Sequence, residues 1–389
     1  MREDEIQILG SAPEKKRLVR RAVLFVVLVA GALLLGLLAL RIFLNDKGEQ
    51  STTIDKPLQS YVDSVLVDEM KMVQAMWGQA IVMEVATGEV KAMVNVQRKL
   101  GGKYVDVEDF GRQLEPGSIV MPSMLLAVLE IAGGKMTDVV DTYGGVAPID
   151  GILIKDHNWE KGGYGEITLD EALRFNSNIA VAKVVSSAFK GKEHDFFKQL
   201  QKMGMGQPDS IDGLVGMKPM TFTAPADSSW QDYTLAYHAI GYERKMTPLQ
   251  ILTFYNAIAN RGTMMKPTLR KGHSEIVKPQ IASKDNILAM QQTLRNVVEK
   301  GLGKKAATDK VAVAGMMGTC QVEKFESLIE DADYADYHLS FCGYFPADQP
   351  KYSIMVSLMK EGIPASGGGM CGPVFRQIVE YMMRYTDVD

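Results

Sequence analysis

The sequence has few of the residues from which metal sites and disulfide scaffolds are built. Its 389 residues include only three cysteines and five histidines, and none of these has the spacing of a metal-ligating set. The net charge is −4 and no basic stripe occurs, which argues against a nucleic-acid partner. The sequence therefore predicts a protein without a bound metal, cofactor or nucleic acid.

One apolar run stands out near the N-terminus. Residues 22–40, AVLFVVLVAGALLLGLLAL, carry no charge and would span about 28 Å as a helix, close to the thickness of a bilayer core. Basic residues precede the run more densely than they follow it, which places the N-terminus in the cytoplasm. A cleaved signal peptide is the alternative, but its apolar core would be shorter and no small-x-small cleavage site follows Leu40.

We therefore expect an uncleaved, single-pass anchor in the inner or plasma membrane. The expected organisation is a cytoplasmic tail over 1–21, a transmembrane helix over 22–44, a linker over 45–51, and one domain over 52–389 in the periplasm or outside the cell.

The exported part mixes helix and strand patterns. Alternating apolar residues predict a hairpin of strands 80–85 and 90–96 around Thr87-Gly88. Thr247 as cap, Pro248 as first residue and Gly262 at the end predict a helix. Further helices are expected within 51–73, after Ser118, after Asp170, after Asn178, over 286–300 and after Gly372, with strands near 310–322, 339–347 and 351–359. One sheet with helices on its faces, an α+β fold, accommodates this order.

The stretch LEPGSIVMPSMLLAVLE, residues 114–130, contains a candidate nucleophile. Pro116-Gly117 breaks the chain and Ser118 opens the helix that follows. An acyl-transfer serine needs a base within hydrogen-bond distance, commonly one helical turn away. The residue at that position is Met121. Ser118 is therefore either a nucleophile without its base or a helix cap.

Seven segments, in order from about Thr52 to the C-terminus, resemble the transpeptidase domain of penicillin-binding proteins, the serine acyltransferases that crosslink peptidoglycan. They are TTIDKPLQ, VMEVATGEVKAMVN, LEPGSIVMP, GEITLDEALRFNSNIAVAKV, HAIGYERKMTPLQ, VAVAGMMGTCQV and CGYFPADQPKYSIMV. The resemblance implies the penicillin-binding and serine β-lactamase-like fold, an antiparallel sheet flanked by helices. It also implies a peptidoglycan stem peptide or a β-lactam as ligand.

The resemblance further implies three site motifs, SxxK, SxN and KTG, which supply the nucleophile, its base, a proton shuttle and an oxyanion hole. This sequence keeps the nucleophile position as Ser118, but four motif positions are altered: Met121, Asn176, Met316 and Met317. The positions that would bind substrate are kept as Asn178, Gly318 and Thr319.

Methionine matches lysine in length and lack of branching but carries no charge, so these changes remove basicity while conserving volume. Three hypotheses follow. The preferred one is a pseudoenzyme that acts as an interaction or regulatory component of cell-wall synthesis, with Ser118 retained as a helix cap. The second is an active transpeptidase or carboxypeptidase with an unusual base, for which His157 is a candidate. The third is a non-covalent receptor for stem peptides that uses Asn178 and Thr319.

Two details remain open from the residues. Cys320 lies two residues beyond Gly318 and is a candidate substitute nucleophile, although free cysteines are more often small buried hydrophobes. Cys320 and Cys342 fall on consecutive strands and could pair, but sequence does not give the register.

Large anchored family members carry a pedestal domain; here residues 41–51 span at most about 35 Å. We therefore expect a domain close to the membrane, with membrane proteins of the wall-synthesis machinery as partners.

Overall fold

The computed structural model consists of two units, Met1–Thr52 and Thr53–Asp389, and it describes residues 23–32, 34–37, 52–208, 211, 214, 217–322 and 335–385. In the first unit, residues 23–32 and 34–37 are helical. None of the described helices is long and apolar enough to cross a membrane. The expected tail 1–21, the expected linker 45–51, and residues 22, 33 and 38–44 of the expected span lie outside the described residues.

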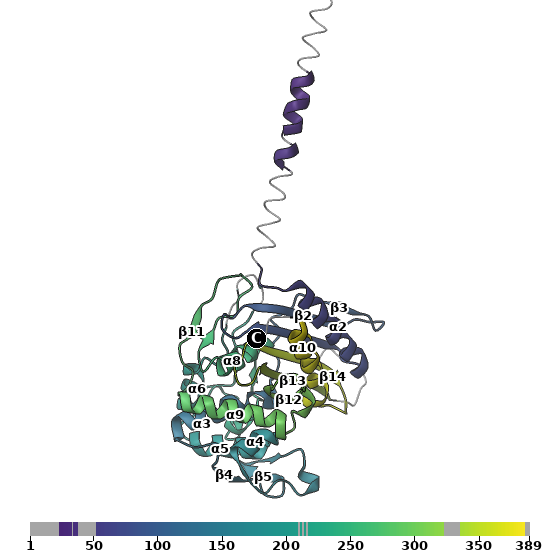
Figure 1. Ribbon diagram of the computed structural model, residues 1–389. Helices are drawn as coiled ribbons and strands as arrows, with labels where there is room; N and C mark the ends of the chain where they lie inside the picture. Colours follow the sequence, from purple (N-terminus) through teal and green to yellow (C-terminus); the bar gives the residue numbers. More distant parts are fainter. Residues whose placement is uncertain are drawn as a thin grey trace, which may run out of the picture. The chain divides into compact units, whose positions relative to one another are not determined.

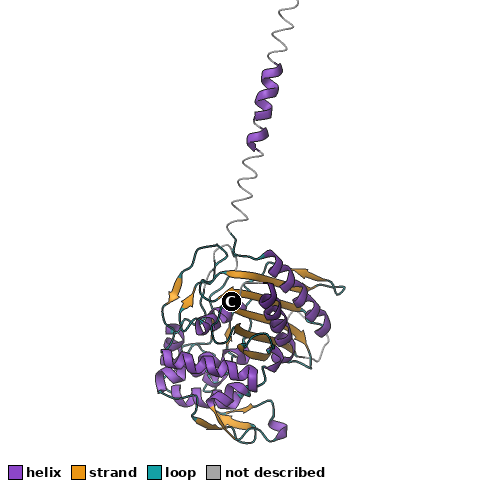
Figure 2. Ribbon diagram, viewed as in Figure 1, coloured by secondary structure: helices purple, strands orange, loops and turns teal. Residues whose placement is uncertain are grey.

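The second unit is built on a six-stranded antiparallel sheet in the order β12-β13-β14-β1-β2-β3. The N-terminal hairpin therefore lies beside the C-terminal strands, and β1 pairs with β14 from Trp77↔Met359 to Glu84↔Tyr352 (Figure 2). The sheet strands are β1 (Trp77–Glu84), β2 (Val90–Arg98), β3 (Tyr104–Asp106), β12 (Ala314–Val322), β13 (Asp336–Phe345) and β14 (Tyr352–Glu361). The predicted hairpin and the predicted late strands are confirmed.

Helices flank this sheet, which confirms the α+β fold class. Helix α2 (Lys56–Val73) contacts β1, β2 and α10 (Gly372–Tyr385), while α8 (Pro248–Ala259) contacts β13 and β14 and α9 (Lys284–Lys300) contacts β12 (Figure 1). A helical lobe holds α3 (Met121–Ala132), α4 (Leu169–Arg174), α5 (Asn178–Phe189) and α6 (Glu193–Lys202), and α7 (Thr234–Ala239) packs on α5. Short two-stranded sheets pair β4 (Val139–Asp141) with β7 (Glu166–Thr168), β5 (Val146–Ile149) with β6 (Ile152–Lys155), β8 (Thr221–Phe222) with β9 (Arg244–Lys245), and β10 (Met264–Met265) with β11 (Ile276–Lys278).

The start of α8 shows how local chemistry sets these boundaries. The Thr247 hydroxyl accepts a hydrogen bond from the Gln250 N–H, and the Gln250 side chain accepts one from the Thr247 N–H. This capping box satisfies two otherwise free donors. The prediction of Thr247 as the cap residue is confirmed. The helix ends at Ala259 with Asn260 as its cap, and the predicted Gly262, with a φ of +96°, closes the turn that follows by donating its N–H to the Ala257 carbonyl (2.8 Å).

The register of β12 and β13 determines whether Cys320 and Cys342 lie opposite each other. In the β12–β13 ladder Cys342 pairs with Met316, whereas Cys320 pairs with His338, four positions along the strands. Cys320, Cys342 and Cys371 are all buried free thiols. The disulfide that sequence left open is therefore not formed in this structure.

Glu69 of α2 gives a testable pH dependence. It is 5 % exposed, and burial raises its pKa from 4.5 to about 7. Above pH 4.5 the unfolded chain releases this proton more readily than the folded one, so stability falls as pH rises and levels off above about pH 7. We expect this group to remove at most about 3 kcal/mol over that window. Urea unfolding of Glu69→Gln should show a flatter pH profile than the unmodified protein.

Asp68→Asn is the matched control, because the neighbouring Asp68 side chain is 78 % exposed. Its profile should follow that of the unmodified protein. If the free energy of unfolding changes by the same amount between pH 5 and pH 7 in the unmodified protein and in Glu69→Gln, this role for Glu69 is contradicted.

Candidate active site

Ser118 lies in a 3₁₀ turn, Gly117–Val120, that leads into α3. The Met121 N–H donates a hydrogen bond to the Ser118 carbonyl, which closes the turn. Val120, the last residue of this turn, is the N-cap residue of α3. The Ser118 side chain makes no capping hydrogen bond, and its Oγ has no partner within the described residues. The interpretation of Ser118 as a helix cap is therefore wrong: its hydroxyl is buried, in a residue that is 4 % exposed, and it caps no helical N–H group.

Close backbone approach presses this turn against β12. Gly117 has a φ of +64°, and a Cβ there would lie 2.7 Å from the Cys320 Cβ. A Cβ on Gly318 would lie 3.2 Å from the Ile119 nitrogen, so only glycine leaves room for the turn at that point of the strand. Two hydrogen bonds hold the turn from its other sides: Gly117 N–H to Gly241 O (3.1 Å) and Tyr255 Oη–H to Ile119 O (2.6 Å). The turn that carries Ser118 is thus held firmly in place, and the neighbouring chain buries the serine.

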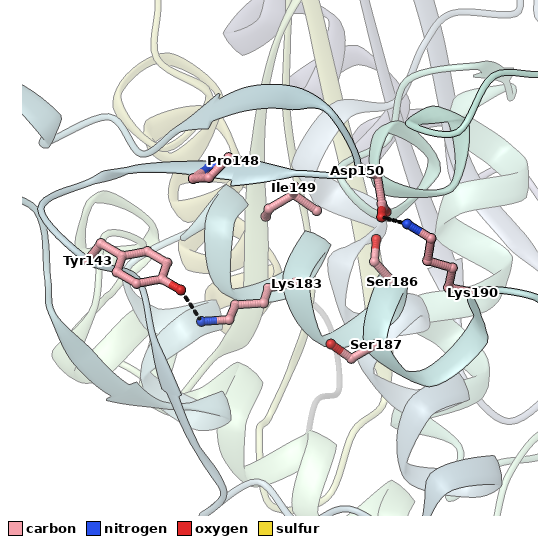
Figure 3. Close-up of a pocket in the computed structure, with 8 residues that line it drawn as sticks. All are labelled: Tyr143, Pro148, Ile149, Asp150, Lys183, Ser186, Ser187 and Lys190. Atoms are coloured by element: carbon pink, nitrogen blue, oxygen red, sulfur yellow. Dashed lines mark hydrogen bonds and ion pairs between the residues drawn. The ribbon is translucent and has the colours of Figure 1, made fainter.

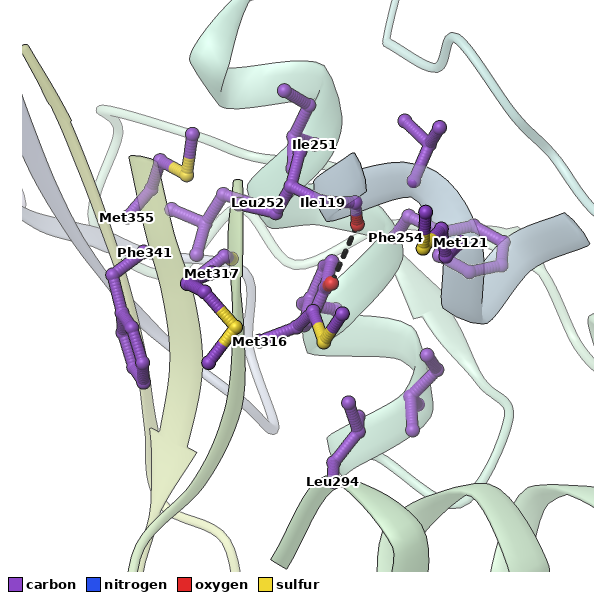
Figure 4. Close-up of a cluster of buried hydrophobic side chains, with 14 of the residues drawn as sticks. Ile119, Met121, Ile251, Leu252, Phe254, Leu294, Met316, Met317, Phe341 and Met355 are labelled. Carbon is purple, nitrogen blue, oxygen red and sulfur yellow. Dashed lines mark hydrogen bonds between the residues drawn. The ribbon is translucent and has the colours of Figure 1, made fainter. Parts of the chain in front are cut away.

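The three methionines at lysine and threonine positions belong to the hydrophobic core. Met121 and Met316 are fully buried and Met317 is 4 % exposed. Figure 4 draws all three in one apolar cluster with Phe254, Phe341 and other side chains. A thioether cannot take a proton from Ser118, and an apolar surrounding disfavours any charged replacement. The altered motif positions therefore hold packing residues where the family chemistry needs bases.

The second motif serves to anchor α5. The Ser177 hydroxyl caps this helix by accepting from the Ala180 N–H (3.1 Å) and donates to Asp156 Oδ2 (2.7 Å), while Asp156 Oδ1 accepts from the Ile179 N–H. Sequence reasoning missed Asp156, for which the only signal was an acidic residue ending a strand pattern. Burial raises the pKa of Asp156, although these hydrogen bonds oppose the shift.

The two asparagines of that motif have different roles. Asn176 adopts a left-handed φ of +53°, which asparagine tolerates better than most residues, and its Oδ1 is buried without a partner in the described part of the chain. The Asn178 side chain donates to the Lys155 carbonyl at 3.1 Å. The amide expected to hold substrate is therefore joined to β6 in this structure.

The third motif lies on β12, an edge strand of the sheet. Met316 pairs with Cys342 and Met317 with Phe341. The retained Thr319 accepts a hydrogen bond on its Oγ1 from the Gly367 N–H at 3.0 Å. Gly367 belongs to the π-helical turn Gly367–Cys371 that follows β14. The hydroxyl expected to bind a substrate carboxylate is thus also used within the fold.

The two alternative reactive groups, Cys320 and His157, differ in their surroundings. Burial raises the pKa of the Cys320 thiol to about 12, so it stays protonated and inert. His157 Nε2 lies 3.0 Å from the Tyr164 hydroxyl, and Tyr164 in turn stacks on Phe175. A second histidine that sequence reasoning did not use, His338, bonds the Glu115 carbonyl through Nδ1 (2.8 Å) and has a pKa lowered to about 4 by burial. It positions the segment before Ser118 as a neutral side chain.

The arrangement defines a class of proteins: a serine on a turn entering a helix, an SN pair opening a second helix, and a GT pair on the edge strand of an antiparallel sheet, as in serine acyltransferases. The family model of the penicillin binding protein transpeptidase domain matches residues 78–380, so the chain belongs to this family. The predicted resemblance is confirmed.

Relatives agree with this assignment. The chain is 25% identical to peptidoglycan D,D-transpeptidase FtsI of Escherichia coli over 347 residues, 87% of this chain and 56% of that protein. It is 27% identical to penicillin-binding protein PbpB of Mycobacterium tuberculosis over 370 residues, 86% of this chain and 52% of that protein. The chain thus spans little more than half the length of these relatives.

Solved structures show the same fold. A peptidoglycan glycosyltransferase from Burkholderia ambifaria superposes with a TM-score of 0.73 at 26% identity, covering 87% of this chain and 98% of that one. The transpeptidase domain of penicillin-binding protein 3 from Burkholderia pseudomallei gives 0.73 at 25% identity, covering 87% and 97%.

Proposed function

We propose that this protein is a membrane-anchored, catalytically degenerate transpeptidase-family member that acts as an interaction or regulatory component of peptidoglycan synthesis. The observation that carries the proposal is Met121, fully buried in the core one turn after Ser118, where the family chemistry requires a base. The buried Met316 and Met317 support it, because they remove the remaining proton-transfer groups. The organisation proposed from sequence, with an anchor over 22–44 and an exported domain over 52–389, goes with this role.

The groups that would serve a non-covalent stem-peptide receptor are engaged elsewhere. Asn178 donates to Lys155 O and Thr319 accepts from Gly367 N–H. Each bond orients its side chain, while the Thr319 hydroxyl keeps its own donor and the Asn178 amide keeps one N–H and its oxygen. The buried Ser118 hydroxyl disfavours an active transpeptidase.

Complementation in cells tests the proposal. A strain that lacks the native gene and expresses Ser118→Ala should match the strain that expresses the unmodified protein in growth, shape and wall crosslinking. The reason is that the hydroxyl makes no hydrogen bond within the described part of the chain and, on this proposal, does no chemistry. The deletion strain gives the size of defect that the assay detects. A Ser118→Ala strain that reproduces the deletion defect, at normal protein level, would overturn the pseudoenzyme proposal.

A further inference from the structure

An open cleft lies outside the motif site, between α5 and the β5–β6 hairpin (Figure 3). Its volume is about 340 Å³, within the range of small-molecule sites. The residues that line it are Tyr143, Pro148, Ile149, Asp150, Lys183, Ser186, Ser187 and Lys190. Four of them come from one stretch of α5 and its C-terminal cap, beginning five residues after Asn178.

Two lysines, seven positions apart on that stretch, supply positive charge to the cleft. Lys183 Nζ donates to the Asp141 carbonyl (3.0 Å) and to the Tyr143 hydroxyl (3.2 Å), which leaves one of its three donors for a ligand. Lys190 Nζ pairs with Asp150 Oδ1 at 2.6 Å and keeps two donors. The side chains that line the cleft therefore supply two lysine charges and one carboxylate, and the acidic Asp232 and Glu193 also act on Lys190.

Two polar atoms of the cleft are buried without a partner in the described residues. Ser186 is 5 % exposed and its Oγ makes no hydrogen bond. Asp150 Oδ2 likewise has none, although Oδ1 of the same carboxylate pairs with Lys190. In Figure 3 the Ser186 hydroxyl points toward the Asp150 side of the cleft. Buried polar atoms without partners are uncommon in folded proteins, and a bound ligand is one way to satisfy them.

We propose that this cleft binds an anionic sugar. Lys183 and Lys190 would pair with the carboxylate or phosphate of the ligand, since lysine is an effective point charge for either group. Ser186 Oγ and Asp150 Oδ2 would bond ring hydroxyls, a donor–acceptor combination that a simple inorganic anion does not satisfy. Tyr143, Pro148 and Ile149 provide an apolar wall for one face of the ring.

The proposal goes beyond the proposed function and does not depend on it, because no atom of Ser118, Met121 or the β12 motif takes part. An acylation or complementation experiment leaves it untouched, and a binding experiment at the cleft leaves the assignment of Ser118 untouched.

Calorimetric titration of the full-length protein tests it with three probes: N-acetylmuramic acid, which carries a carboxylate, glucose 6-phosphate, which carries a phosphate, and N-acetylglucosamine, which is neutral. We expect at least one anionic sugar to bind about tenfold more tightly than the neutral one, a difference that ion pairing of this kind can supply. The ratio of the affinity for the anionic sugar to the affinity for the neutral sugar should fall as salt is added. Which of the two anionic sugars binds more tightly identifies the anion.

Variants locate the binding in the cleft. Lys183→Met and Ser186→Ala should each weaken the preferred sugar by about fivefold or more. Lys198→Met is the matched control, because Lys198 is an exposed lysine of α6 outside the cleft, and it should bind as the unmodified protein does. Since Lys183 also bonds the Asp141 carbonyl, Lys190→Gln provides a second variant that leaves that contact in place. Equal affinity for charged and neutral sugars, no binding of any of the three, or binding unchanged in all cleft variants would overturn the proposal.

Discussion

A fluorescent penicillin should leave Ser118 of the full-length protein unlabelled at doses and times that saturate an active family member run in parallel. Acylation requires removal of the serine proton as the hydroxyl attacks, and Met121 supplies no base at the position where the family has lysine. In a serine hydrolase whose groups act as a unit, loss of one member costs on the order of 10⁶ in turnover. The burial of the Ser118 hydroxyl adds a second barrier, because the β-lactam carbonyl must reach it.

Gel fluorescence and intact-protein mass measure this directly. Ser118→Ala is the control for non-specific labelling, and the two proteins should give the same faint signal. A mass increase of one penicillin per chain that disappears in Ser118→Ala would show that another group activates the serine, and the active-transpeptidase hypothesis would replace the pseudoenzyme one.

Local sequence patterns predicted the main helices and strands of this fold, because the interactions that begin and end these elements lie within a few residues of each other. The Thr247 cap with Pro248 behind it is an example, as is the β1–β2 hairpin around Thr87-Gly88. Acidic Asp170 and Glu171 in the first turn of α4 follow the same logic. The three late strands were also predicted, but the position of each strand in the sheet was not.

The site itself was only partly predictable, because its decisive contacts join distant parts of the chain. Ser118 precedes a helix in sequence, but the 3₁₀ turn that removes its capping role is held by Gly241 and Tyr255. The sequence gives no sign that the Thr319 hydroxyl accepts a hydrogen bond from the Gly367 N–H, because the two residues are 48 positions apart. No periodicity or spacing encodes such contacts. What sequence did identify was the chemical nature of the altered motif positions, since that depends on residue type alone.

The three methionines at altered motif positions have one physical consequence in common: they place apolar core side chains where the family motifs have lysine or threonine. A lysine that acts as a general base is kept partly neutral by desolvation, but it still needs polar partners for the proton that it gains. Here Met121 and Met316 are fully buried in one apolar cluster (Figure 4). The same cluster would penalise a lysine at either position, so the packing of this structure favours methionine there. This coupling can be measured.

Met121→Lys should destabilise the domain by about 3–5 kcal/mol, the range for an unpaired charge placed in a core. Met121→Leu is the matched control, because it conserves volume without adding charge and should cost less than about 1.5 kcal/mol. Urea unfolding followed by tryptophan fluorescence gives both values.

The pH dependence separates charge from packing. Desolvation would lower the pKa of the introduced lysine in the folded state below its unfolded value near 10.4. The unfolded chain then binds the proton more readily, so the penalty is full below the folded-state pKa and shrinks as pH rises toward about 10. The difference between Met121→Lys and Met121→Leu should therefore narrow from about pH 6 to about pH 9. If the two variants have equal stability at every pH, the pocket at position 121 admits a solvated ammonium, and the argument that the former active site has been sealed into the core loses its basis.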